Sequence, residues 1–192
     1  MSLKEKKLKN SSLIKKALYF AAEKHDGQYR KGGRVPYIVH PVQVALGVSK
    51  YTNDEKIIAV AFLHDVIEDC PDVSISLLRK EFGGYIAQLV DEVSLLKKKQ
   101  YATWKEKKLE YLEKIKHASK NALIIVAVDK MNNLQAYFNA LKKEGKASMR
   151  DFRGTPDEYR WYYTEIENIL VSRLGKHSVV KDYIKTWKLY KK

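Results

Sequence analysis

The chain has 192 residues, 45% of them hydrophobic, which suits one globular domain and excludes intrinsic disorder as the default. Nine glycines and four prolines favour helices over a turn-rich β architecture, and the single cysteine, Cys70, excludes an internal disulfide framework. The formal net charge of +14 attracts polyanions, but nucleic acids, anionic membranes and multiply phosphorylated small molecules all meet that description.

The sequence shows no targeting or membrane-spanning pattern. The lysine-rich residues 1–10 are not followed by the apolar stretch and small-residue site of a signal peptide. The longest apolar runs, residues 57–63 and 122–128, are far shorter than the roughly 20 residues of a membrane helix. We therefore expect a cytoplasmic protein, and the single cysteine agrees with a reducing compartment.

Helical patterns follow one another without a repeat or linker, and we predict one all-α domain over residues 1–192. A loop rich in glycine is expected over residues 26–39. The expected helices are residues 12–25 after a cap at Ser11 or Ser12, a segment from Pro41 through Val48, a helix that ends at Asp69 after a cap at Asn53 or Asp54, a short helix opened by Ser74 or Ser76 and ended before Gly83, and residues 85–96, 104–119, 121–141, 157–174 and 179–190.

One apolar run is open to two interpretations. Residues 123–128 could form a buried strand as well as a buried helix, because periodicity does not separate the two. We predict a helix, since the sequence offers no second strand with which it could pair. A lone strand would leave its backbone hydrogen-bonding groups unsatisfied.

Ionisable side chains follow directly on seven apolar residues in the third predicted helix. Residues 57–63 are apolar all round, which indicates burial on every side, and His64 and Asp65 come next. His64 and Glu68 are four residues apart, as are Asp65 and Asp69, so both pairs lie on neighbouring strips of one face. This pattern favours a functional cluster, although a helix that simply reaches the surface would also explain the acids.

Asp129 repeats the pattern after the apolar residues 122–128. A buried carboxylate needs a partner, because an unpaired buried charge is expelled or neutralised. Lys130 is adjacent in sequence but about 100° away on a helix, so we expect it to be a poor partner. The partner could then be an arginine from elsewhere in the chain or a metal ion, and the metal ion is the more specific hypothesis.

His40 stands where the extended residues 37–39 turn into a helix at Pro41. A lone histidine at a helix start is ordinarily a cap or a surface residue. It becomes a candidate ligand only in the company of the other three residues. His25 and His117 belong to no comparable set, and we interpret them as structural or solvent-facing.

The candidate residues stand within short motifs that keep their order from about residue 15 to residue 140. A lone His-Asp dipeptide would mean little, but the ordered set is specific. It resembles the HD metal-hydrolase superfamily and, within it, the hydrolase domain of RelA/SpoT-type alarmone enzymes. The motifs are HDGQYRK (25–31), PYIVHP (36–41), HDVIED (64–69), FG (82–83), LVDEV (89–93) and DKMNNL (129–134).

The resemblance implies a single-domain helical bundle of the HD type in which His40, His64, Asp65 and Asp129 bind one divalent cation. It implies Mn²⁺, which two imidazoles and two carboxylates suit by ligand hardness, while iron and zinc stay open. It also implies removal of the 3′-pyrophosphate from guanosine tetra- or pentaphosphate, (p)ppGpp, to give GDP or GTP plus pyrophosphate. The length of the chain suggests a small stand-alone hydrolase without the synthetase domain of the long relatives.

The resemblance also assigns roles around the cation. Glu68 and Asp69, one turn beyond the ligands, would orient the attacking water and shuttle its proton, while the cation lowers the pKa of that water. Arg30 and Lys31 would pack on the guanine base and a neighbouring phosphate, because an arginine plane stacks and a lysine supplies a point charge. Asn133 would reach the ribose and the phosphate edge.

The sequence departs from the family pattern beside the nucleotide-binding residues. Gln135 replaces the usual arginine and Ala136 follows it. Asn132 stands where histidine or tyrosine is common, and Cys70 stands where threonine is frequent. None of these is a proposed metal ligand, so the expected reaction type is unchanged and the nucleotide stays open.

Two other functions are compatible with the residues. A phosphohydrolase of the same class could act on another nucleotide, such as the 2′-phosphate of NADPH. A basic helical module could bind RNA, DNA or an alarmone without hydrolysing it, but no helix-turn-helix or aromatic RNA-binding signature is present. We expect a guanosine polyphosphate as the partner rather than a membrane or nucleic acid, and we leave the oligomeric state open, a homodimer included.

Overall fold

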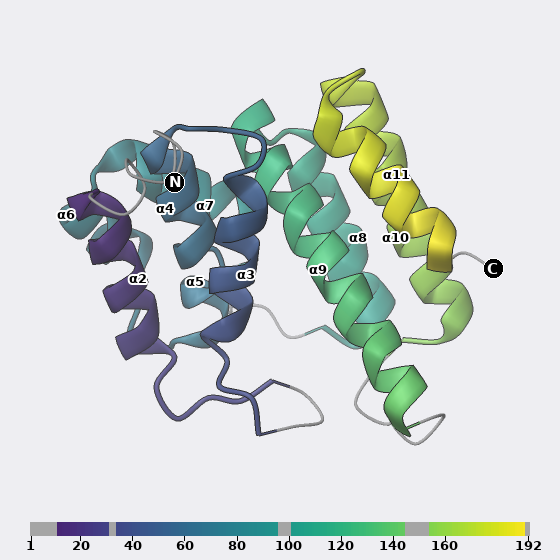
Figure 1. Cartoon of the computed structure of the whole chain (residues 1–192), viewed down its shortest axis with the longest axis horizontal. Coiled ribbons are helices and arrows are strands. Elements are labelled where there is room, and N and C mark those ends of the chain that lie inside the picture. Colours follow the sequence, from purple (N-terminus) through teal and green to yellow (C-terminus); the bar gives the residue numbers. More distant parts are fainter. Residues whose placement is uncertain (1–10, 31–33, 96–100, 145–153, 191–192) are drawn as a thin grey trace, which may run out of the picture.

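The computed structural model describes residues 11–30, 34–95, 101–144 and 154–190 (Figure 1). Within these ranges the regular elements are helices, with one isolated antiparallel bridge between Tyr29 and Pro36, so the predicted all-α fold is confirmed. The helices are α2 (Ser12–Lys24), α3 (Val39–Val48), α4 (Glu55–Leu63), α5 (Val66–Asp69), α6 (Ile75–Phe82), α7 (Gly84–Val93), α8 (Trp104–Lys116), α9 (Lys120–Glu144), α10 (Pro156–Leu174) and α11 (Ser178–Tyr190).

Side-chain caps determine where several helices begin. Ser11, Asp54 and Ser74 each accept a hydrogen bond from a backbone N–H of the first turn, which decides between the alternatives that the sequence left open. At the start of α10, Thr155 and Glu158 satisfy each other's backbone N–H groups in a capping box. Each such cap stabilises its helix by about 1 kcal/mol.

The helices form two adjoining groups, α2 to α7 in one and α8 to α11 in the other (Figure 1). Helix α4 lies inside the first group, where it contacts α2, α3 and α7. Helix α9 contacts α3, α4 and α7 across the junction, and it also contacts α10 and α11 of its own group. The two helices that the sequence marks as most apolar therefore lie where the groups meet.

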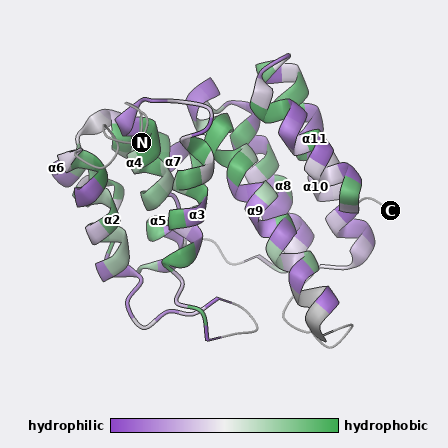
Figure 2. Cartoon of the chain, in the orientation of Figure 1, coloured by the Kyte–Doolittle hydropathy of each residue, from purple (hydrophilic) through white to green (hydrophobic). Residues whose placement is uncertain are grey.

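The two apolar runs are buried as predicted. Every residue from Ile57 to Leu63 in α4 and from Ala122 to Val128 in α9 is buried, and the hydrophobic colour gathers at this junction (Figure 2). Each fully buried Val, Leu or Ile side chain contributes about 1.5–3 kcal/mol to folding. The second run is helical, which confirms the helix interpretation over the strand. No helix in the described ranges is long and apolar enough to cross a membrane.

A glycine allows α3 to approach α9 closely. A Cβ atom at Gly47 would lie 2.5 Å from Cγ1 of Val128, far closer than real side chains come. With any larger residue at this position, the Val128 side chain or the spacing of the two helices would have to change. His40 lies about two turns before Gly47 on α3, and Asp129 follows Val128 on α9, so the contact brings these two predicted ligands to the same region.

The prediction of one continuous helix up to Asp69 is wrong. The helix divides into α4 and α5 at His64 and Asp65, which lie outside both. The hydroxyl of Ser94 lies 2.7 Å from the backbone carbonyl oxygen of His64 and 2.7 Å from that of Val90, so a residue beyond the end of α7 contacts the carbonyl that a continuous helix would use itself. This tertiary hydrogen bond lies 30 residues away in sequence, outside the reach of local patterns.

Other helix ends differ from the expected ones by a few residues. The second predicted helix starts at Val39 rather than Pro41. The helices predicted to end at residues 96 and 119 stop at Val93 and Lys116. These differences have the size usual for helix boundaries, where the last turn frays.

Candidate metal centre

The four predicted ligands come from three places in the fold and converge. His40 stands in the first turn of α3, His64 and Asp65 join α4 to α5, and Asp129 lies in α9. Nε2 of His40 lies 3.4 Å from Oδ2 of Asp65 and 3.1 Å from Oδ1 of Asp129. Nε2 of His64 lies 3.1 Å and 3.7 Å from the same two oxygens. The nitrogens and oxygens of all four side chains thus face one small space.

Hydrogen bonds at the far side of each imidazole determine which nitrogen faces this space. Nδ1 of His64 lies 2.8 Å from the carbonyl oxygen of Ala61, which only accepts, so Nδ1 carries the hydrogen. Nδ1 of His40 lies 2.7 Å from Oδ1 of Asn132, whose amide nitrogen donates to Gln43. In both neutral imidazoles the Nε2 lone pair consequently points at carboxylate oxygens.

This arrangement needs a positive charge. Nε2 of His64 is buried and has no well-aligned hydrogen bond, although Oδ2 of Asp65 is 3.1 Å away. Burial disfavours the imidazolium, but the charges of Asp65 and Asp129 outweigh burial and raise the pKa of His64 well above its usual value. The space therefore attracts a proton or a metal ion.

The donor set fits a divalent cation. His40, His64 and Asp65 offer ligand atoms that all lie within 4.8 Å of one another, a group that could hold a metal ion. Asp129 lies outside that tightest group but contacts both imidazoles. Imidazole and carboxylate ligands suit divalent transition metals, and a hydrogen bond behind each imidazole is the usual support for a metal-binding histidine.

The expectation that Lys130 is a poor partner for Asp129 is wrong. Nζ of Lys130 lies 2.5 Å from Oδ2 of Asp129, and only 12% and 7% of the two side chains are exposed. The angle of about 100° describes where the Cβ atoms point, whereas the long lysine side chain bends back along the helix. Burial opposes the charge of Lys130, but Asp129 outweighs burial and raises its pKa. Asp129 therefore presents Oδ1 to the imidazoles and Oδ2 to a lysine.

Glu68 and Asp69 both line the site, in different surroundings. Oε1 of Glu68 accepts a hydrogen bond from the backbone N–H of Leu95 at 2.8 Å, and Oε2 lies 3.5 Å from Nζ of Lys107. Burial, followed by the charge of Asp65, raises the pKa of Asp69. Glu68 is thus fixed by two donors, whereas Asp69 holds a proton more readily than an ordinary aspartic acid.

Two of the three predicted substrate residues reach the site, and Lys31 lies outside the described residues. Arg30 donates to Oδ1 of Asn133 at 3.2 Å, and the amide nitrogen of Asn133 donates to Oδ1 of Asp129 at 2.6 Å. The guanidinium of Arg30 also lies over the ring of Tyr37, 5.6 Å from its centroid. A chain of hydrogen bonds therefore connects the loop after α2 to a candidate ligand in α9.

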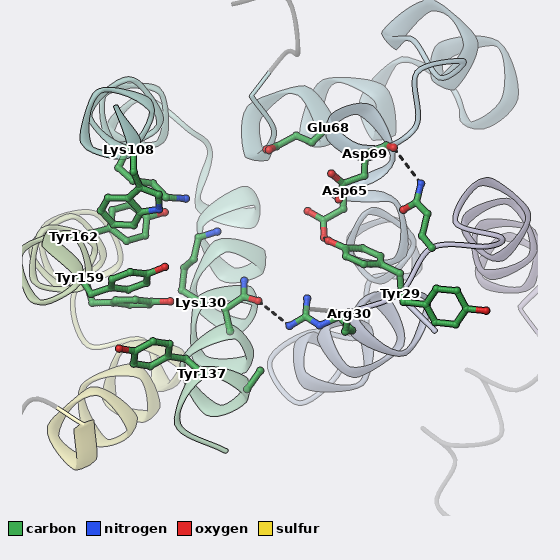
Figure 3. A pocket seen from close by; sticks show the side chains of 16 residues that line it. Tyr29, Arg30, Asp65, Glu68, Asp69, Lys108, Lys130, Tyr137, Tyr159 and Tyr162 are labelled. Carbon is green, nitrogen blue, oxygen red and sulfur yellow. Dashed lines mark hydrogen bonds between the residues drawn. The ribbon is translucent and has the colours of Figure 1, made fainter. Parts of the chain in front are cut away.

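A cavity of about 770 Å³ opens beside the candidate ligands (Figure 3). Its acidic side carries Asp65, Glu68 and Asp69, and a smaller space of about 100 Å³ continues from there to the two imidazoles. Aromatic rings from α8, α9 and α10 form the opposite side. We call them the aromatic wall: Trp104, Tyr137, Tyr159, Tyr162 and Tyr163.

Ring contacts hold the aromatic wall in place. Tyr159 stacks on Tyr137 with centroids 5.2 Å apart and an interplanar angle of 13°, and the centroid of Trp104 lies 4.8 Å from that of Tyr159. Gly154 is buried beside them, where a Cβ atom would come within 3.0 Å of both Trp104 and Tyr159. Aromatic faces of this kind bind nucleobases and other flat rings by stacking.

Sequence reasoning missed the aromatic wall, Tyr37 and Lys108. Tyr37 donates its hydroxyl to Oδ2 of Asp65 at 2.7 Å, and its place inside the motif of residues 36–41 was a usable signal. Aromatic residues at helical spacing look like ordinary core, and Lys108 is one of many lysines in a basic chain. Neither carries a signal in the sequence alone.

The histidines that the sequence analysis set aside do not belong to the group that could hold a metal ion in the described ranges. His25 is buried, with Nδ1 2.9 Å from Oε1 of Gln28. His117 has 80% of its side chain exposed. Both positions agree with the structural and solvent-facing interpretations.

The fold is helical, and two imidazoles and two carboxylates converge in a buried space next to a polar cavity. These features define a class of helical proteins built around a metal centre. The profile described as HD domain matches residues 17–153, and the chain belongs to this family. The predicted membership is confirmed. Membership implies dependence on a divalent metal, in agreement with the group formed by His40, His64 and Asp65.

Curated relatives narrow the resemblance. The chain is 34% identical over 169 residues to a guanosine-3′,5′-bis(diphosphate) 3′-pyrophosphohydrolase of Vibrio cholerae, which covers 86% of this chain and 22% of the relative. It is 36% identical over 118 residues to the enzyme of that name from Haemophilus influenzae, covering 60% of this chain and 17% of the relative. The chain thus spans about a fifth of the length of these relatives.

Solved structures share the fold. A metazoan ortholog of SpoT, described as hydrolysing ppGpp, matches with a TM-score of 0.73 and 25% identity over 93% of this chain and 96% of that one. A Listeria monocytogenes protein matches with a TM-score of 0.68 and 24% identity over 79% of this chain and 98% of that one, which speaks for the fold alone.

Proposed function

We propose that the chain is a metal-dependent hydrolase that removes the 3′-pyrophosphate of guanosine tetra- or pentaphosphate. The observation that carries the proposal is the convergence of His40, His64, Asp65 and Asp129 beside a cavity that also presents lysine, arginine and asparagine side chains. The names of the bacterial relatives and of the metazoan structure support the same substrate.

His40, His64, Asp65 and Asp129 would hold one divalent cation, for which we propose Mn²⁺. The mixed nitrogen and oxygen donor set supports that choice and also suits iron or zinc. When bound, such a cation lowers the pKa of water toward neutrality and withdraws charge from a phosphoryl oxygen.

The reaction consumes one water. The water oxygen bonds to the phosphorus carried by the ribose O3′, the bond between that phosphorus and O3′ breaks, O3′ takes up a proton and pyrophosphate departs. Glu68 would accept the water proton at its carboxylate, which Leu95 and Lys107 hold in place. Asp69, whose pKa is raised, would hold the proton that O3′ requires.

Substrate binding would use the remaining polar groups of the cavity. Arg30 would stack on the guanine, because a planar guanidinium can stack on a base and that of Arg30 already lies over the ring of Tyr37. Asn133 would contact the ribose and phosphate edge, and Lys31 would add charge at the phosphate. Ala136 also lines the cavity, whereas Gln135 lines a separate depression with Gln43 and Asn132.

A nucleotide panel tests the proposal. The chain loaded with Mn²⁺ is incubated with ppGpp, pppGpp, NADPH and ATP, and released pyrophosphate and phosphate are measured separately. We expect pyrophosphate from the two guanosine polyphosphates. Turnover of NADPH alone, with release of phosphate, would replace the proposed substrate while keeping the hydrolase class, and binding without turnover under any divalent metal would favour a binding module.

A further inference from the structure

Lysine side chains gather around the cavity, and one of them differs from its neighbours. Nζ of Lys107 lies 3.5 Å from Glu68, and Nζ of Lys130 lies 2.5 Å from Asp129. Lys108 also lines the cavity, but no carboxylate of the described ranges lies within ion-pair distance of its ammonium group. Lys108 is thus a basic side chain of this cavity that has no carboxylate partner in the part of the chain that the structure describes.

Aromatic rings surround the ammonium group of Lys108. Its Nζ lies 4.8 Å from the ring centroid of Tyr162, 5.5 Å from that of Trp104 and 5.9 Å from that of Tyr111. Ring faces attract a cation, but they replace only part of the water that a free ammonium binds. Burial, followed by the charge of Lys130, accordingly lowers the pKa of Lys108 to about 7. An arriving anion would supply the missing counter-charge.

Lys108 stands where the two parts of the cavity meet. It lines both the outer cavity of about 770 Å³ and the inner space of about 100 Å³ that reaches His40 and His64. The inner space has the volume of about three liquid waters and is too small for a nucleoside. A diphosphate whose first phosphoryl group enters the inner space must therefore place its second group near the junction, where Lys108 lies.

We propose that Lys108 is a specificity-determining residue that binds the distal phosphoryl group of a 3′-diphosphate, so that the site prefers diphosphate esters to monophosphate esters. This inference rests on the proposed function. Glu68 and Asp129 already balance the charges of Lys107 and Lys130, so among the three lysines that line the inner space Lys108 is the one left for the additional negative charge that distinguishes a diphosphate. An ammonium group binds phosphate as a point charge, and recognition of one additional phosphoryl group requires no more than that.

Two substrates that differ only at the distal phosphoryl group test the inference. The kcat/KM values for ppGpp and for guanosine 5′-diphosphate 3′-monophosphate are measured with the Mn²⁺-loaded chain and with Lys108→Met, Lys108→Arg and Lys105→Met. Lys105 is the matched control, because it lies on the same helix over the ring of Trp161 at 5.4 Å, is exposed and lines neither part of the cavity.

We expect Lys108→Met to reduce kcat/KM for ppGpp by about 30-fold, which corresponds to about 2 kcal/mol, and to change the value for the monophosphate by less than about threefold. Lys108→Arg should keep most of the preference, and Lys105→Met all of it. Equal losses on both substrates, or no loss with Lys108→Met, would overturn the inference. Unfolding by urea shows whether each variant is folded.

A binding measurement separates this inference from the proposed function. Calorimetry with inorganic pyrophosphate and inorganic phosphate, with Mn²⁺ in excess, needs no turnover. If ppGpp is not a substrate but the chain prefers pyrophosphate and Lys108→Met removes that preference, the proposed nucleotide is wrong and the role of Lys108 stands. If pyrophosphate binds the chain and Lys108→Met equally well, the role of Lys108 is refuted.

Discussion

The metal side of the cavity and the aromatic wall use their side chains in opposite ways. On the metal side, His40 and His64 are each fixed by a hydrogen bond at Nδ1, to Asn132 and to Ala61. On the aromatic wall, rings contact rings, and the ammonium of Lys108 has no carboxylate partner in the described ranges. The metal side presents carboxylate oxygens and imidazole nitrogens drawn from both helix groups, since Asp129 belongs to α9, whereas the aromatic wall presents ring faces from α8, α9 and α10.

The largest effect is expected from removing an imidazole on the metal side. His64→Ala should reduce bound metal to background and lower the hydrolysis rate by more than about 1,000-fold, because a bound cation contributes several kcal/mol to transition-state stabilisation. Elemental analysis of the purified protein and a pyrophosphate-release assay measure the two quantities.

His117→Ala is the control for this experiment, since 80% of the His117 side chain is exposed. It should change neither quantity. Full metal content in folded His64→Ala would show that the four side chains do not form the metal centre, and the comparison between the two sides would fail.

A smaller effect is expected when the cation stays and a proton acceptor is removed. Glu68→Gln keeps an oxygen for the N–H of Leu95 but loses the negative charge, so metal content should stay unchanged while the rate falls by about 100- to 10,000-fold. The expected split is a loss in kcat with little change in KM. A rate within threefold of the wild-type value would exclude Glu68 as the proton acceptor.

The smallest effect concerns stability on the aromatic wall. The pKa of Lys108 is about 7 in the folded chain and near 10.5 when unfolded, so the unfolded chain binds more protons between these values and stability rises with pH across that window. Lys108→Met removes this slope. The variant should be more stable than the wild type by on the order of 1 kcal/mol near pH 7, after allowance for solvent screening of the partly exposed side chain.

Urea unfolding of both proteins at pH 7 and pH 10 measures this difference. The gain in stability from Lys108→Met should be largest at pH 7 and shrink toward pH 10. A variant that is less stable than the wild type at pH 7 would show that ring contacts stabilise the ammonium more than burial destabilises it. Lys108 would then be held in place by its neighbours, as His40 and His64 are on the metal side.

The sequence predicted the metal side far better than the aromatic wall. His64, Asp65 and Asp129 directly follow apolar runs, which departs from the ordinary pattern of a helix. A departure of this kind can be recognised from a few neighbouring residues of the sequence. Tyr159 and Trp104 break no pattern, because aromatic residues in amphipathic helices ordinarily face a core. Only the packing of α8 against α10 shows that these rings line a cavity.

The errors have the same origin. At the helix break, the carbonyl oxygen of His64 contacts the hydroxyl of Ser94, and the ion pair of Lys130 depends on how a flexible side chain bends. Both are set by tertiary contacts and rotamers, which local spacing rules do not contain. The caps at Ser11, Asp54 and Ser74 were within reach, because a cap acts within one turn of its own helix.

The contact between Gly47 and Val128 gives the metal centre a vulnerable point outside itself. An alanine methyl group at residue 47 would press on the Val128 side chain between α3 and α9. Because His40 and Asp129 belong to those two helices, whatever part of this pressure the Val128 side chain does not absorb would widen the gap between their ligand atoms, now 3.1 Å, without altering either side chain. The spacing of the candidate ligands in this protein therefore depends on a residue that touches none of them.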